Sequence, residues 1–256
     1  MNDRQLREAV LQMMADFGNL FLRAAQSTKL SKLGRKGTFQ VAFIARTYER
    51  FESGRVLIEN GQEFSSAELS RSAMESQASL RYLSKQARGF FVLEISDRVE
   101  VLRGIDLDLC DSSLAPQKKQ SLERKRKRIK ARIKLLNSRG VNSVRLSERV
   151  AMLGHDFSVV YAWLCGMVHH NLSSLKQSHL ILVGDSQQFE SMNMLASEEF
   201  LAVVEPLFTS LLYAATIQKA LSRSEFRAEW QATILAMRKV YLNFTSIAVN
   251  SKEGVE

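Results

Sequence analysis

Apolar side chains recur every three to four residues along most of this chain, which is the period of an amphipathic α-helix and not of a strand. The first such pattern runs from about Asp3 to Ser27, and the second covers roughly Phe39 to Glu59. The dipeptide Asn60-Gly61 then supplies a common helix stop signal. Two long helices joined by a basic loop are therefore expected at the start of the chain.

The middle of the chain continues in helices. Ser65 and Glu68 have the spacing of a capping box, which predicts that a third helix starts there and runs on towards Arg103. Pro116 suits the first turn of a long helix over 116–139 because its missing N–H would have no partner there in any case.

The remaining segments predict further helices and little else. A short helix is expected to end at Gly154, and Asp156 is a good N-cap for a helix that reaches His170. Ser197 begins a long apolar helix, and Ser224 caps a last one that ends near Phe244. At most one short extended segment is expected, at 179–184, and a frayed tail at 250–256.

Helix breakers are scarce, with two prolines and 12 glycines in 256 residues. No linker is long enough to demand a second domain, and the sequence contains no internal repeat. We therefore predict an all-α fold, a single helical bundle of about seven helices spanning 1–256, with the 116–139 helix on its surface. The sequence does not predict an oligomeric state.

The cysteines and the apolar runs favour a cytoplasmic, soluble protein. Cys110 and Cys165 lie far apart and form no CxxC pattern, which argues against a disulfide framework. The N-terminus lacks the apolar run of a signal peptide. The longest apolar stretch, 201–217, is interrupted by Glu205 and Pro206, so it predicts a buried helix and no transmembrane segment.

The net charge of +9 comes from one segment, since 118–134 holds ten basic residues and one acidic residue and the rest of the chain is neutral. Its narrow apolar seam predicts a helix lying on the bundle. The cations point to nucleic acid, an acidic protein or an anionic membrane face, although few aromatics are interleaved and a merely solvated face is the alternative. The predicted binding residues are Arg124, Lys125, Arg126, Lys127, Arg128, Lys130, Arg132 and Lys134.

Two polar stripes interrupt otherwise apolar helices. Arg71 and Glu75 lie one turn apart, with Tyr82 two turns further on, and Tyr161 and His169 lie on a second helix at i and i+8. Two such stripes predict one shared internal site.

These stripes resemble a bacterial all-helical family catalogued as domain of unknown function 5677. That family pairs an Arg-x3-Glu helix that ends in Tyr-Leu with a tyrosine-rich helix that ends in a histidine. The residues in those places are Arg71, Glu75, Tyr82, Tyr161 and His169. His170 doubles the histidine, so either imidazole is a candidate. The resemblance spans roughly 46–175 and implies a helical fold but no activity. A looser likeness links the chain to helical ribonuclease domains of toxin and phage-defence systems, although no arginine stands in the six residues before His169.

Arg71, Glu75, Tyr161, His169 and His170 are the candidate catalytic residues. An ionised glutamate beside an arginine could orient a histidine that acts as acid or base, or the same groups could simply lock two helices in register. Adjacent histidines on a helix diverge by about 100°, so one metal ion rarely takes both, and we predict no metal. No Gly-rich phosphate loop, HExxH or GxSxG motif is present, and we predict no cofactor.

Two functions from different classes follow. The first is a cytoplasmic helical protein that acts by binding, with the basic helix contacting an acidic partner or nucleic acid. The alternative is a hydrolase or ribonuclease that uses the His/Arg/Glu cluster between two core helices.

Overall fold

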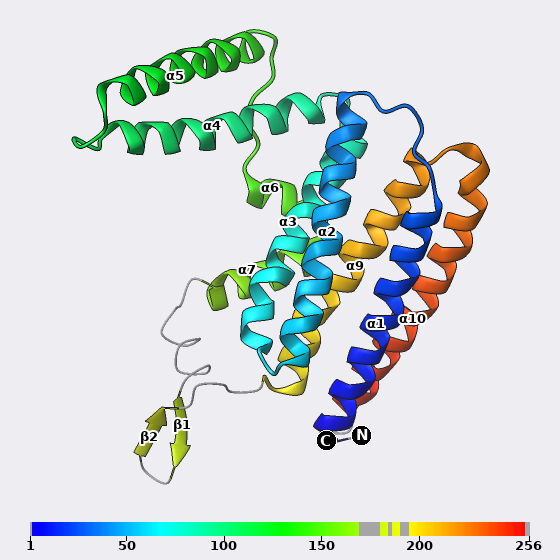
Figure 1. The fold of residues 1–256 in the computed structure, drawn as a ribbon. Helices are drawn as coiled ribbons and strands as arrows, with labels where there is room; N and C mark the ends of the chain where they lie inside the picture. The colour runs from blue at the N-terminus through cyan, green and yellow to red at the C-terminus, as the bar shows by residue number, and fades with distance from the viewer. Residues whose placement is uncertain (1, 169–179, 184–185, 190–194, 254–256) are drawn as a thin grey trace. The chain divides into compact units, whose positions relative to one another are not determined.

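The computed structural model describes residues 2–168, 180–183, 186–189 and 195–253, and these residues form an all-α fold, as predicted (Figure 1). They contain nine α-helices, one 3-10 turn (η1, Ser224–Phe226) and one two-stranded ribbon. The α-helices are α1 (Asp3–Ser27), α2 (Arg35–Glu59), α3 (Glu63–Lys85), α4 (Gly89–Leu109), α5 (Pro116–Asn137), α6 (Leu146–Ala151), α7 (His155–Val168), α9 (Ser197–Leu221) and α10 (Arg227–Glu253).

The chain divides into two compact units, and the two boundaries between them lie within α3 and α6. The bundle unit comprises Met1–Leu80 and Val150–Glu256, and the hairpin unit comprises Arg81–Arg149. That both units belong to one domain, as the sequence suggests, stays a prediction.

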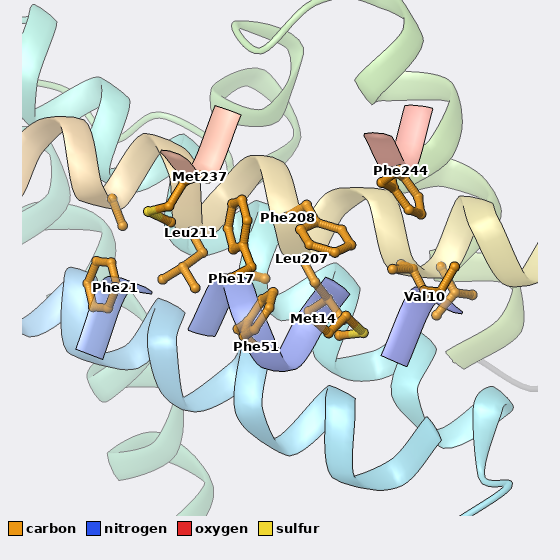
Figure 2. Packing of buried hydrophobic residues seen from close by; sticks show 14 of the residues in the cluster. Val10, Met14, Phe17, Phe21, Phe51, Leu207, Phe208, Leu211, Met237 and Phe244 are labelled. Atoms are coloured by element: carbon orange, nitrogen blue, oxygen red, sulfur yellow. The ribbon is translucent and has the colours of Figure 1, made fainter. Parts of the chain in front are cut away.

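The core of the bundle unit forms around α9, which packs against α1, α2 and α10. Phe208 of α9 lies among Phe17 of α1, Phe51 of α2 and Phe244 of α10, and all four rings are at most 1% exposed (Figure 2). The Phe208 and Phe17 rings meet edge to face at 4.8 Å between centroids, an orientation that aromatic pairs favour. The helical periodicity of the sequence thus corresponds to a real four-helix core.

Helix α9 is long and apolar enough to cross a membrane by length and composition, with a mean hydropathy of 1.7 over its most apolar window. In the structure 61% of that window is buried within the protein. The core helix of a folded bundle can have the same length and composition as a membrane span. The predicted burial of the apolar stretch 201–217 is therefore confirmed.

The helix expected to run from Ser65 towards Arg103 is instead two helices, and this prediction was wrong. Helix α3 ends at Lys85 and α4 begins at Gly89, whose N–H donates to the carbonyl of Gln86 at 3.0 Å. A Cβ at position 89 would lie 2.6 Å from the carbonyl oxygen of Tyr82. Only glycine fits this close approach, so Gly89 marks a turn that the apolar periodicity conceals.

Three helix starts also differ from the prediction. Helix α2 begins at Arg35, four residues before the predicted start at Phe39. Helix α3 begins at Glu63, so Ser65 and Glu68 lie inside its first two turns and do not form a capping box at its start. Helix α7 begins at His155, so Asp156 lies in its first turn and is not the N-cap. For α3 and α7, the predicted capping residue still gives the position of the helix start to within a few residues.

Helix α10 continues to Glu253, past the predicted end near Phe244 and into the segment 250–256 expected to be a frayed tail. The extension follows from packing, because Ile247 and Ala248 still pack against the core of the bundle unit. Residues 254–256 lie outside the described residues.

The extended segment expected at 179–184 is confirmed as β1 (Leu180–Val183), which pairs antiparallel with β2 (Ser186–Phe189). The register places Val183 opposite Ser186. The second strand escaped prediction because Ser-Gln-Gln-Phe lacks the alternation of apolar and polar residues that marks a strand.

The hairpin unit consists mainly of α4 and α5, which lie side by side in opposite directions (Figure 1). A small cluster of its own, Val92, Ile95, Leu136 and Val141, is buried between them. The half-buried ring of Tyr82 packs against this cluster.

Candidate functional site

Helices α3 and α7 bring together three of the five predicted catalytic residues. Arg71 and Glu75 lie one turn apart on α3, and the guanidinium Nε is 3.3 Å from Glu75 Oε1. The hydroxyl of Tyr161 on α7 donates to the same carboxylate oxygen at 3.0 Å. The polar stripes of the two helices therefore meet, as the sequence analysis predicts.

The cluster is half-buried, with side-chain exposures of 21% for Arg71 and 25% for Glu75. Burial, the negative charge of Glu75 and the neighbouring Cys165 together raise the pKa of the Tyr161 hydroxyl well above its usual range. Tyr161 is accordingly protonated at neutral pH and serves as a donor to Glu75, and it cannot act as a base there. The arrangement ties α7 to α3 through one carboxylate.

The two remaining candidate catalytic residues, His169 and His170, lie outside the described residues. Tyr82, which follows Arg71 and Glu75 on the same stripe, belongs to the hairpin unit. A small pocket of about 50 Å³ is lined by Asp156, Phe157, Val160, Glu205 and Pro206, none of which belongs to the cluster. Within the described ranges, no group of three or more His, Cys, Asp or Glu residues is placed to hold a metal ion.

A second buried polar cluster in the bundle unit was not predicted. The Arg7 guanidinium forms a two-pronged ion pair with Glu63, with Nε–Oε1 at 2.5 Å and Nη2–Oε2 at 3.1 Å. The same guanidinium donates to the Leu195 carbonyl, and the Leu195 N–H donates to Glu63 at 2.9 Å. Arg7 also lies over the Phe200 ring at 5.0 Å. This cluster fixes α1, α3 and the start of α9 to one another.

The basic helix α5 has two distinct faces. Arg132 binds both oxygens of Glu94 on α4 at 2.9 Å, and Arg126 lies 2.7 Å from Asp106. The hydrogen bond from Arg132 is the largest of the effects that lower the pKa of Glu94, and burial opposes it; Arg98, 2.8 Å away, lowers the pKa further. These two cations of α5 therefore hold the hairpin together.

The other six predicted binding residues are exposed to solvent. Among the described residues, none of the six has a carboxylate within ion-pair distance. They are Arg124, Lys125, Lys127, Arg128, Lys130 and Lys134. The hairpin unit contains 18 basic and 8 acidic residues, a net charge of +10, which leaves 18 basic and 19 acidic residues, a net charge of −1, in the bundle unit. The positive charge of the protein is therefore a property of the hairpin unit.

A family model described as "Family of unknown function (DUF5677)" matches residues 40–188, more than half of the chain. The chain belongs to this family. The matched range contains every predicted catalytic and binding residue of this DUF5677 protein, which confirms the resemblance drawn from the two polar stripes. Helix α1 lies before the matched range, and α9 and α10 lie after it.

No curated protein and no solved structure matches the chain. The looser likeness to ribonuclease domains therefore has no support from these comparisons.

The Tyr161→Phe variant is expected to lower the free energy of unfolding by about 1 kcal/mol, because Glu75 loses a donor in a half-buried site. Urea denaturation followed by circular dichroism measures the change. Val159→Ala, on the exposed side of the same helix, is the control. A Tyr161→Phe variant as stable as the control would show that the hydrogen bond does not tie α7 to α3.

Proposed function

We propose that this DUF5677 protein acts by binding, and that the outer face of α5 contacts nucleic acid. The observation that supports this is that the cations of α5 fall into two groups. Arg126 and Arg132 pair with Asp106 and Glu94 of α4. Six further cations remain exposed within three turns. Such a row of cations lowers the free energy of binding to phosphates mainly by releasing condensed counterions.

The composition of the outer face favours nucleic acid over a membrane surface. A helix that binds in a membrane interface needs an apolar face to insert. The apolar seam of α5 is committed to the hairpin, since Ile129 and Leu136 are only 6% and 2% exposed. Leu135, 43% exposed, is the single large apolar side chain exposed on α5, which is too little to insert the helix into a membrane. The cations therefore lie on a mainly polar surface, which suits a hydrated phosphate backbone.

Helix α5 contains no aromatic residue, which favours a duplex over a single-stranded nucleic acid as its ligand. Proteins that bind single strands commonly stack bases on aromatic side chains, and α5 has none to offer. Contacts from lysine and arginine to the backbone of a duplex require no stacking and carry no direct sequence information. We therefore expect duplex binding that is independent of sequence. A cytoplasmic location, suggested by the cysteine pattern, is part of this proposal.

The test compares two quadruple variants of the full chain in binding to a fluorescent duplex across a salt series. The outer-face variant replaces Arg124, Lys127, Arg128 and Lys130 with glutamine. The matched control replaces four exposed cations of the bundle unit, Lys29, Lys36, Arg46 and Arg227, and so removes the same charge. Each lost phosphate contact reduces the slope of log K against log salt by about 0.9, so the outer-face variant should lose up to about 3.6.

Binding that depends steeply on salt and falls much further in the outer-face variant supports the proposal. Equal losses in both variants, or no binding of the unchanged protein at low salt, would overturn it. The same samples are run on a denaturing gel to test the hydrolase alternative. Cleavage that disappears in Glu75→Gln, with duplex binding retained, would support an active site at the Arg71–Glu75–Tyr161 cluster instead.

A further inference from the structure

The line of α5 that lies farthest from its buried side is marked by Ala131. Ile129 and Leu136, the two buried residues of α5, lie about 160° and 140° around the helix axis from Ala131, since each residue turns an α-helix by about 100°. Ala131 itself is exposed and carries only a methyl group. This outermost line is called the crest of α5 below.

The exposed cations of α5 lie on both sides of the crest. On one side, the arginine flank, Arg124 and Arg128 lie about 20° and 60° around the axis from Ala131. On the other side, the lysine flank, three exposed cations lie about 40–100° around the axis from Ala131. They are Lys127, Lys130 and Lys134. Lys125 lies farther from the crest, next to the Arg132 that pairs with Glu94, and belongs to neither flank.

We propose that α5 lies in the major groove of B-form DNA, with the arginine flank on the phosphates of one strand and the lysine flank on those of the other. This inference rests on the proposed function of α5. A helix with its side chains is about 10–12 Å across, and the major groove is about 12 Å wide, so the two flanks can reach both strands at once. The methyl group of Ala131 faces the base edges and offers no hydrogen bond to them, which agrees with binding that is independent of sequence.

Two flanks of cations favour this placement over two other ways of binding a duplex. A helix that lies along the backbone of one strand uses the cations of one flank and leaves the other flank in solvent. In an RNA duplex the major groove is deep and narrow, so a helix cannot enter it and both flanks cannot be used together. The arrangement of charge on α5 therefore points to DNA as the class of nucleic acid.

Glu123 sets the N-terminal limit of the inserted segment. It is exposed on the lysine flank, one turn before Lys127. A carboxylate there would be repelled by the phosphates that the lysines contact. The segment that enters the groove is accordingly 124–134, which is about 15 Å long.

The first test asks whether both flanks contribute to binding of one DNA duplex by the full chain. Each flank loses two exposed cations in its own double variant, and a third double variant removes two exposed cations of the bundle unit as a control. The variants are Arg124→Gln with Arg128→Gln, Lys130→Gln with Lys134→Gln, and Lys29→Gln with Arg46→Gln. Each flank variant should reduce the slope of log K against log salt by about 1.8, and the control should leave it unchanged. A loss confined to one flank would show contact with a single strand and overturn the groove placement, while the proposed function would stand.

The second test blocks the groove. The unchanged protein is titrated with three duplexes of one sequence: DNA, DNA in which glucosylated 5-hydroxymethylcytosine fills the major groove, and RNA. The glucosylated DNA and the RNA should each bind about tenfold or more weakly than the unmodified DNA, because the flanks could no longer reach both strands together. Equal affinity for the glucosylated DNA, or equal affinity for the RNA, would overturn the groove placement. Failure to bind any of the three would overturn the proposed function and this inference with it.

Discussion

Arg7→Met is expected to lower the free energy of unfolding of the bundle unit by about 3–5 kcal/mol, because it leaves the Glu63 carboxylate buried without its cation. Glu63 is 1% exposed and Arg7 is 7% exposed. The variant also removes a donor from the Leu195 carbonyl, where α9 begins. Methionine fills much of the space of the arginine stem, so the loss comes mainly from charge and hydrogen bonding and not from a cavity.

Urea denaturation of Arg7→Met, Glu63→Gln and the double variant measures this effect as a thermodynamic cycle. The double variant should be more stable than Arg7→Met alone, since it no longer buries an unpaired charge. Arg4→Met is the control, because Arg4 lies three residues earlier in an ion pair with Glu8 and its side chain is 88% exposed. If Arg7→Met unfolded at the same urea concentration as Arg4→Met, the buried ion pair would not be holding α1, α3 and α9 together.

Local patterns predicted the helices well where packing and periodicity agree. The bounds expected for the first helix are those of α1, because its apolar residues all face one core. The turn at Gly89 was missed because its cause is a close approach between Gly89 and the Tyr82 carbonyl, which periodicity does not report. The extension of α10 was missed because it depends on what Ile247 and Ala248 contact in the folded state.

The contrast between local spacing and long-range contact also explains which polar sites could be predicted. Arg71 and Glu75 form a pair within one helix, so their spacing in the sequence predicts it. The contact with Tyr161 was predicted from the two polar stripes on apolar helices. Arg7 and Glu63 stand 56 positions apart, and no local pattern joins them. A signal was nevertheless present, since Arg7 shares the apolar stripe of Val10 and other buried residues of α1 and must therefore be paired.

The two faces of α5 also lay beyond sequence analysis. Eight basic residues were predicted to bind a partner, and the acidic residues of α4 decide which of them are available. Glu94 and Asp106 pair with Arg132 and Arg126, so the face proposed to bind nucleic acid is made by the other six cations. A count of charge along the chain locates a basic surface, but only the neighbouring helix shows how much of it is exposed.

Phe208→Ala is expected to lower the free energy of unfolding by about 3–5 kcal/mol, because a large cavity would open at the centre of four packed helices. The ring contacts Phe17 at 4.8 Å and Phe244 at 4.9 Å between centroids, and it is fully buried (Figure 2). Phe208→Leu keeps most of the volume and should be less destabilising. Phe91→Ala, at a ring 39% exposed in the hairpin unit, is the control.

This variant also tests the role of α9, whose composition alone would suit a membrane. If α9 is the central helix of a water-soluble bundle, protein purified without detergent should unfold cooperatively, and Phe208→Ala should shift the urea midpoint far more than Phe91→Ala. In a membrane-spanning α9 the same ring would face lipid or other membrane helices, and the detergent-free protein would give no cooperative transition for the variant to shift. A steep transition in the unchanged protein that moves strongly in Phe208→Ala therefore assigns the apolar character of α9 to the core in Figure 2.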